Sequence, residues 1–149
     1  KCLELGADFA VDHRKEDWHK EVRAISKELA KKKGEAPGID LSFDHIGETH
    51  WNQQLQLLKY GATLVSCGAT TGYNAKTDLR HVFFKGTNIL GSTQGTKAEL
   101  DQALYWMGQG KIKAAIDSTY TFEQAAEAHT KMLTGKGLFG KILMKPEGA

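Results

Sequence analysis

The sequence predicts an α/β protein built on a doubly wound parallel sheet. Short apolar runs alternate along the 149 residues with longer segments whose apolar residues recur on a helical period. The connections between these segments are short, and many contain glycine. Alternating strands and helices with short connections favour parallel strands joined by crossover helices. With 40% hydrophobic residues, the chain can bury one core.

The first segments predict a strand, a helix and a second strand. Residues 9–11 form a short apolar run, and residues 39–43 form another after a Pro-Gly turn. Between them, Asp17 is placed to cap a helix that stops near Gly34. One face of this helix is apolar and consists of Trp18, Val22, Ile25 and Leu29.

The next segments repeat this order. Thr49 is the predicted N-cap of a helix that ends at Gly61, with an apolar face of Trp51, Leu55 and Leu58. A strand over residues 62–67 follows directly. Residues 73–85 then predict one or two short helical turns before a strand over residues 87–90.

The last third of the chain contains two capping boxes. Thr96 and Glu99 form the first, which opens a helix ending near Met107 at Gly108 and Gly110. Its predicted buried stripe consists of Leu100, Ala103, Leu104 and Met107.

A strand around residues 112–116 follows. The second capping box joins Thr121 to Gln124 and opens a helix between this strand and a final strand over residues 138–144. The apolar face of the helix consists of Phe122, Ala125, Ala126, His129 and Met132, and we interpret His129 as a packed core residue.

Composition excludes several classes of function. The 20 basic and 18 acidic residues are interspersed and leave a net charge of +2, which gives no electrostatic reason to expect nucleic-acid binding. No signal peptide and no apolar run of the roughly 18 residues needed to cross a bilayer occur, so no membrane partner is expected. Two cysteines fit a reducing compartment, and we expect a cytoplasmic protein. The chain has no initiator Met and opens on what reads as a helix end, as expected for part of a longer protein.

Motifs for other chemistries are incomplete. His45 and His50 lie five residues apart with no HExxH motif and no cysteine pair, so we expect no metal site in this chain. The segment 135–141 has the glycine and lysine spacing of a phosphate-binding P-loop, but Ile142 replaces the required Ser or Thr and a strand follows. Cys67 reads as a buried, inert thiol.

Two polar, glycine-bearing turns follow strands 39–43 and 62–67. In open α/β sheets, nucleotides bind in the crevice outside the carboxyl ends of the strands. We therefore expect the turns at Ile46-Gly47 and Gly68-Ala69 to open on the same side of the sheet and to leave a groove for a dinucleotide. No G-x-G-x-x-G motif and no complete set of catalytic residues occur.

Several phrases together resemble one family. In order and spacing, they are similar to the C-terminal half of medium-chain dehydrogenase/reductases, in the branch of zinc-type alcohol dehydrogenases and quinone oxidoreductases. The phrases are Leu5-Gly6-Ala7-Asp8, Phe43-Asp44-His45-Ile46-Gly47, Cys67-Gly68-Ala69, Ile89-Leu90-Gly91-Ser92-Thr93-Gln94-Gly95-Thr96, Ala126-Glu127-Ala128-His129 and Phe139-Gly140-Lys141-Ile142.

The resemblance implies a partial Rossmann-type sheet in an NAD(P)H-dependent oxidoreductase acting on an alcohol, carbonyl or quinone. By that likeness, Ile46 and Gly47 lie against the adenosine half of the cofactor. Gly68, Ala69 and Thr70 pass under the pyrophosphate and the nicotinamide ribose. Small residues suit this role because the backbone must approach the ligand closely.

The likeness also implies contacts further along the chain. Leu90, Gly91 and Ser92 offer backbone groups to the carboxamide of the nicotinamide. His13 and Lys136 stand where quinone-oxidoreductase-like members often contact the 2′-phosphate of NADPH, with a tyrosine and an arginine there. NADP is therefore preferred, with NAD as the alternative.

The resemblance assigns residues 1–110 to the C-terminal part of the dinucleotide-binding domain. Residues 111–149 are then a tail returning to a GroES-like catalytic domain. The glycine-rich phosphate loop, the first two strands, any zinc ligands and the proton donor are implied to lie in the missing N-terminal part. We therefore expect this chain alone to hold no catalytic residue, to be inactive and to be marginally stable. Strand 87–90 is expected to pair with a second copy as an edge.

Two alternatives to an enzyme portion remain open. One is a non-catalytic nucleotide-binding or scaffold module that keeps the sheet without the chemistry. The other is a flavodoxin-like domain, which would make the purified protein yellow.

Overall fold

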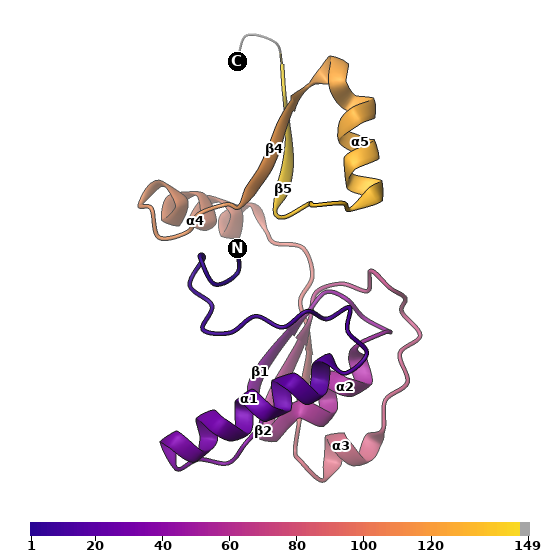
Figure 1. Cartoon of the computed structure of the whole chain (residues 1–149). Helices are drawn as coiled ribbons and strands as arrows, with labels where there is room; N and C mark the ends of the chain where they lie inside the picture. The colour runs from indigo at the N-terminus through magenta and orange to yellow at the C-terminus, as the bar shows by residue number, and fades with distance from the viewer. Residues whose placement is uncertain (147–149) are drawn as a thin grey trace. The chain divides into compact units, whose positions relative to one another are not determined.

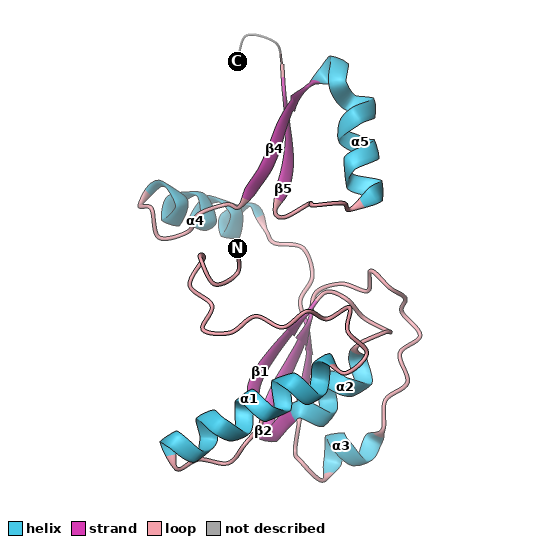
Figure 2. Ribbon diagram, viewed as in Figure 1, coloured by secondary structure: helices cyan, strands magenta, loops and turns pink. Residues whose placement is uncertain are grey.

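A computed structural model describes residues 1–146, which divide into two compact units, Lys1–Gln94 and Gly95–Ala149. Figures 1 and 2 show the elements of both units. Residues 147–149, at the end of the predicted tail, lie outside the described residues. The assignment of residues 1–110 and 111–149 to different functional domains stays a prediction.

The first unit is built on a parallel sheet of three strands in the order β1-β2-β3. Its register places Phe43 beside Val65, and Val65 beside Leu90. Parallel neighbours require crossover connections, which helices provide here. The strands are β1 (Ile39–Asp44), β2 (Leu58–Ser66) and β3 (Asn88–Gly91), and the helices are α1 (Trp18–Lys33), α2 (Trp51–Leu57) and α3 (Leu79–Phe83). The predicted α/β class with parallel strands is confirmed.

Helix α1 has the predicted bounds, but its first turn is stabilised differently. It ends at Gly34, whose φ of 70° is left-handed and suits glycine. Asp17 occupies the N-cap position without capping, because its carboxylate pairs with Lys20 at 2.8 Å. Ser26 holds the helix against the start of β1, since its Oγ accepts from the N–H of Gly38 at 2.5 Å and donates to the carbonyl of Gly38 at 3.2 Å.

The boundary between α2 and β2 differs from the prediction. The N-cap is His50 rather than Thr49, and Leu58 is already extended and pairs with Ile39. Gly61 lies inside β2 instead of ending the helix.

The cause lies in a later segment of the chain. Nζ of Lys85 donates to the carbonyls of Leu55, Gln56 and Leu58 at 3.2, 3.0 and 2.8 Å. A cation on the final carbonyls satisfies the helix end without a glycine.

The core of the first unit lies between α2 and one face of the sheet. The cluster consists of Leu55, Leu58, Ala62 and Leu64, with Ile39 and Trp51 packed against it. On the opposite face, Leu41 and Phe43 of β1 are 60% and 66% exposed.

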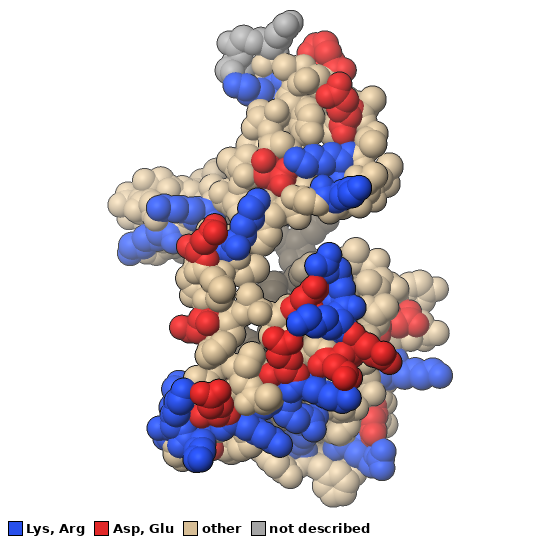
Figure 3. All heavy atoms as spheres, in the orientation of Figure 1, with Lys and Arg blue, Asp and Glu red and all other residues tan. Residues whose placement is uncertain are grey.

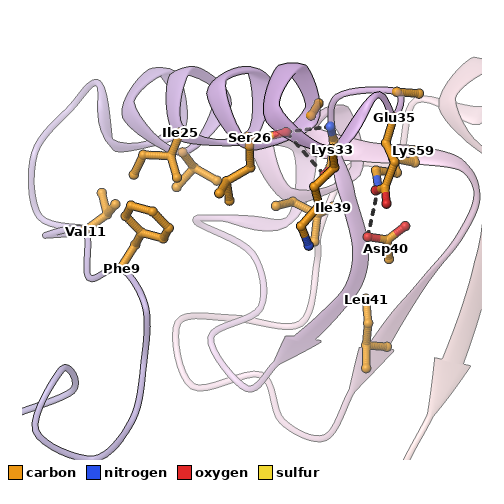
Figure 4. A pocket seen from close by; sticks show the side chains of 15 residues that line it. Phe9, Val11, Ile25, Ser26, Lys33, Glu35, Ile39, Asp40, Leu41 and Lys59 are labelled. Atoms are coloured by element: carbon orange, nitrogen blue, oxygen red, sulfur yellow. Dashed lines mark hydrogen bonds and ion pairs between the residues drawn. The ribbon is translucent and has the colours of Figure 1, made fainter.

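Residues 9–11 do not form the predicted strand. A cavity of about 530 Å³ separates them from β1, with Phe9 and Val11 on one side and Leu41 on the other (Figure 4). A strand needs a neighbour for its backbone hydrogen bonds, and none pairs with this segment within residues 1–146.

The second unit contains a parallel strand pair. Its elements are α4 (Lys97–Gly108), β4 (Ile116–Thr121), the 3₁₀ turn η1 (Phe122–Gln124), α5 (Ala125–Thr134) and β5 (Lys141–Lys145), with β4 beside β5. The first capping box is confirmed, since Oγ1 of Thr96 accepts from the N–H of Glu99 at 3.3 Å and the Glu99 carboxylate accepts from the N–H of Thr96 at 2.6 Å. The predicted burial of the α4 stripe is wrong, because Leu100 and Leu104 are 58% and 54% exposed.

The predicted strand over residues 112–116 is also displaced. Asp117 sets the observed position, because its carboxylate accepts from the N–H of Phe139 at 3.0 Å and forms an ion pair with Lys131 of α5. In the second capping box, the N–H of Thr121 donates to Oε1 of Gln124 at 3.0 Å.

The predicted inner face of α5 is wrong in part. Ala128 is buried at 4% exposure, whereas His129 is exposed and is not a packed core residue. Ala125, Ala128 and Lys131 share one side of α5. The ion pair between Lys131 and Asp117 directs this side toward β4.

Candidate cofactor site

The turns after β1 and β2 lie side by side at the carboxyl ends of their strands. The N–H of Cys67 donates to the carbonyl of Asp44 at 2.8 Å. Oγ1 of Thr70 donates to the carbonyl of His45 at 2.8 Å, and the N–H of Thr71 donates to that of Ile46 at 2.8 Å. The expectation that both turns open on the same side of the sheet is confirmed.

The space between the two turns is closed, contrary to the prediction of a groove there. A Cβ on Gly47 would lie 2.7 Å from the carbonyl oxygen of Gly72 and 2.9 Å from Cα of Ala69. A Cβ on Gly68 would lie 3.2 Å from the carbonyl oxygen of His45. Because neither glycine carries a side chain, the two turns can pack backbone against backbone. The hydrogen bonds from Thr70 and Thr71 hold the turns together.

Asp44 shapes the first turn. Its side chain is buried, and its oxygens accept from the N–H groups of Ile46 and Gly47, both at 3.1 Å, and from Nε2 of Gln54 at 2.7 Å. Oε1 of Gln54 accepts in turn from Oγ of Ser42 at 2.6 Å. Sequence reasoning missed this role, although an aspartate closing a strand two residues before a backbone turn is a common signal.

A cavity of about 430 Å³ lies beside the first turn. Its walls come from α1, β1, the turn and α2, and they bring Ile46 together with His13. The ring of His50 meets the rings of His13 and Trp18 edge to face, with centroids 5.3 and 5.1 Å apart. The walls thus combine apolar surface with a few polar groups, as small-molecule sites commonly do.

The cation next to His13 is already paired. Arg14 donates from Nε and Nη2 to the carboxylate of Asp12, both at 2.8 Å. This guanidinium, with the N–H of Arg14, holds the pKa of Asp12 well below its usual range. Arg14 is therefore committed to Asp12, which leaves His13 as the group of this segment that lines the cavity.

The residues predicted at the end of β3 lie beside the end of β2. Gly91 pairs with Ser66, and the N–H of Ser92 donates to the carbonyl of Ser66 at 2.9 Å. A Cβ on Gly91 would meet no atom within 4 Å, so its backbone is open on this edge. Lys136 belongs to the second unit, where it follows α5, and its contact with a cofactor stays a prediction.

The remaining predictions concern the environment of Cys67, metal ligands and membrane-spanning helices. Cys67 is exposed, so the prediction of a buried thiol is wrong, because β2 ends one residue earlier at Ser66. Within residues 1–146, no group of three or more His, Cys, Asp or Glu side chains is placed to hold a metal ion. In the same part of the chain, no helix has the length and hydrophobicity to cross a membrane.

The fold and these turns define part of a nucleotide-binding α/β unit of the Rossmann type. A family model described as zinc-binding dehydrogenase matches residues 5–144. The chain therefore belongs to the zinc-binding dehydrogenase family, within the medium-chain dehydrogenase/reductases, as the resemblance predicted.

Curated relatives are similar in sequence to most of the chain. Human quinone oxidoreductase is 31% identical over 132 residues, which cover 85% of the chain and 39% of the relative. Acryloyl-coenzyme A reductase of Sulfurisphaera tokodaii is 31% identical over 122 residues, covering 80% and 35%. Crotonyl-CoA reductase of Streptomyces collinus is 26% identical over 159 residues, covering 98% and 35%.

Solved structures match the arrangement of the elements. An NAD-dependent alcohol dehydrogenase has a TM-score of 0.78 at 31% identity, covering 96% of this chain and 39% of that one. A crotonyl-CoA carboxylase/reductase in complex with NADP has a TM-score of 0.80 at 23% identity, covering 96% and 39%, and this likeness concerns the fold. The chain thus spans 35% to 39% of the length of these proteins.

Proposed function

We propose that this chain forms part of the nicotinamide-cofactor crevice of an oxidoreductase that moves hydride between NAD(P)H and an alcohol, carbonyl or quinone. The observation that carries the proposal is the alignment of three strand-end turns, after β1, β2 and β3, in a chain of this family. When bound, the cofactor supplies or accepts the hydride. The residues of this chain bind and orient it.

The proposed contacts follow the geometry of the turns. Ile46 and Gly47 present the first turn to the adenosine half, beside the cavity that His13 lines. Gly68, Ala69 and Thr70 form the second turn. Because the space between the two turns is closed, these residues are proposed to present backbone to the pyrophosphate and ribose on the outer side of the turn.

The third turn takes the other end of the cofactor. Leu90, Gly91 and Ser92 offer backbone groups at the end of β3 to the carboxamide. The open space around Gly91 supports this role, because a ligand must approach the backbone closely there.

We propose NADPH as the preferred cofactor, with NADH as the alternative. In the first unit, the imidazole of His13 lines the cavity beside Ile46 and is offered to the 2′-phosphate. The role of Lys136, which belongs to the second unit, stays a prediction from the family resemblance. The name of the NAD-dependent relative supports a nicotinamide cofactor without deciding between the two. Any zinc of the whole enzyme is proposed to be held outside this chain, and its two free cysteines favour a cytoplasmic setting.

Tryptophan fluorescence tests the binding step. Trp18 lines the cavity beside Ile46, so we expect NADPH to quench emission of the full chain, and Ile46→Arg to weaken binding at least tenfold. Leu133→Arg is the matched control, since Leu133 is 85% exposed in the second unit. Equal affinity in both variants would contradict the proposal, and binding without turnover in the complete parent would favour a scaffold module.

A further inference from the structure

We infer that the first unit has a second binding site, a cationic groove at the amino-terminal ends of β1 and β2 that takes a diphosphate group. The six residues of β1 run from Ile39, near this groove, to Asp44 at the cofactor turns. At about 3.3 Å per residue, the two places are roughly 17 Å apart along the strand. The inference does not rest on the proposed cofactor crevice.

The groove is a built feature of the fold. A cavity of about 480 Å³ lies between α1 and the junction of α2 with β2, and an adjoining cavity of about 300 Å³ shares Arg23, Lys27 and Gln56 with it. The two hydrogen bonds between Ser26 and Gly38 hold α1 against the opposite wall. Arg23 and Lys27 are one helical turn apart, so their side chains project from the same face of α1.

The lining of both cavities is basic and contains no Asp or Glu. Its Lys and Arg residues are Lys20, Arg23, Lys27, Lys59 and Lys85. In Figure 3, lysine and arginine side chains gather along the lower part of the first unit, where α1 runs.

Most of these cations already have partners. Lys20 pairs with Asp17, Lys59 pairs with Asp40 and Glu35, and Lys85 binds backbone carbonyls.

Arg23 and Lys27 are the cations left for a ligand. Within the described residues 1–146, neither side chain makes a hydrogen bond or an ion pair. Burial, and to a lesser degree the charge of Arg23, lowers the pKa of Lys85. The lining of the groove holds no carboxylate between Arg23 and Lys27. A divalent or trivalent anion between Arg23 and Lys27 relieves this repulsion.

Two further groups extend the site beyond its charges. Tyr60 lines the groove with 80% of its surface exposed, which leaves a ring face free for a flat group. Nδ1 of His19, in the wall of the smaller cavity, is buried and has no hydrogen-bond partner within residues 1–146. A diphosphate held by Arg23 and Lys27 can come from a nucleotide stacked on Tyr60 or from inorganic pyrophosphate.

Isothermal titration calorimetry of the full chain tests the site with inorganic pyrophosphate and ADP. ADP also resembles half of the proposed cofactor. ADP is therefore titrated into the Ile46→Arg variant, in which binding at the cofactor site is expected to be weakened. We expect both ligands to bind, and Arg23→Gln combined with Lys27→Gln to weaken each at least tenfold. Lys31→Gln combined with Lys97→Gln removes the same charge outside the groove, and we expect less than a twofold change.

These titrations distinguish a nucleotide from inorganic pyrophosphate as the source of the diphosphate, and they can overturn the inference. Tyr60→Ala is expected to weaken ADP alone if the source is a nucleotide, whereas equal pyrophosphate and ADP affinities unaffected by Tyr60→Ala support the inorganic source. Absence of pyrophosphate binding, or equal losses in the groove variant and its control, would overturn the inference. Circular dichroism of each variant confirms that it is folded.

Discussion

At the residue scale, glycines at the strand ends differ in what they permit. Gly47 has a φ of 86° and contacts the neighbouring turn, so its lack of a side chain is required by the fold. Gly91 has open space around it and no left-handed φ, so the fold tolerates a methyl group there. Spacing in the sequence does not distinguish the two, because the difference depends on what another segment places beside each.

This contrast predicts opposite results for two substitutions. Gly47→Ala is expected to lower the free energy of unfolding by about 1–3 kcal/mol, because alanine is strained at this φ and meets the carbonyl of Gly72. Gly91→Ala is expected to change it by less than about 0.5 kcal/mol while weakening NADPH binding. Urea unfolding and fluorescence titration measure both, and equal destabilisation by the two variants would show that the turns do not pack as described.

The role of the polar residue Asp44 also depends on what another segment places beside it. Its position at the end of an apolar run is visible in the sequence, as is the turn that follows. Its partner Gln54 lies ten residues further on, across a crossover, so the hydrogen bond between them depends on how α2 packs.

At the scale of elements, helix ends are decided by the groups that reach them. Lys85 ends α2 from a segment almost thirty residues away, which is why the glycine rule placed that boundary too late. Local signals succeeded at Thr96 with Glu99 and at Gly34, and failed at Asp17, whose carboxylate pairs with Lys20 instead of capping.

Removing the Lys85 ammonium tests this account of α2. Lys85→Met is expected to cost about 1–3 kcal/mol, because three carbonyls lose their donor in a partly buried place. Lys76→Met, at an exposed position, serves as the control with a change below about 0.5 kcal/mol. Chemical denaturation measures both, and a neutral Lys85→Met would mean that water replaces the ammonium at no cost.

In the second unit, Asp117 ties β4 to α5 and to the start of β5. The Lys131 ammonium, the N–H of Phe139 and the hydroxyl of Ser118 hold the pKa of Asp117 well below its usual range. A carboxyl with a lowered pKa stabilises the fold above its unfolded value of about 4, and this stabilisation is lost as the pH falls through the folded value.

Acid unfolding therefore has a predicted dependence on this residue. Asp117→Asn is expected to reduce stability at pH 7 and to flatten its decline below about pH 4, because the titrating group is gone. Asp101→Asn on the exposed side of α4 is expected to leave the decline unchanged. Circular dichroism against pH measures both, and parallel acid curves for Asp117→Asn and the parent chain would contradict the assignment.

At the scale of the whole molecule, the first unit leaves apolar surface on a strand with one free edge. Leu41 and Phe43 project from β1, which pairs within the described residues with β2 alone. Parallel sheets are normally covered on both faces. This exposure supports the expectation that the chain alone is marginally stable. That the chain alone turns over no NADPH stays a prediction, which an NADPH oxidation assay with quinone and alcohol substrates measures.

The free edge of β3 carries the proposal of a homodimer. Ile89 and Leu90 are 39% and 52% exposed there, and an edge strand offers unpaired backbone groups to a second copy. Ile89→Lys is expected to shift the mass measured by light scattering from dimer to monomer, since charge on an edge opposes pairing. Leu133→Lys is the control, and a monomeric parent chain would remove the basis for the proposal.

The sequence by itself determined the alternation of strands and helices and the caps at Gly34 and Thr96, because these are encoded within neighbouring residues. It also indicated the family, through phrases whose order and spacing extend along the chain. It also placed the turns after β1 and β2 at one edge, since parallel strands align their carboxyl ends. Only the tertiary structure decided that these turns touch, that Lys85 ends α2 and that residues 9–11 remain unpaired. Those outcomes depend on contacts between residues far apart in the chain, whose geometry no local pattern records.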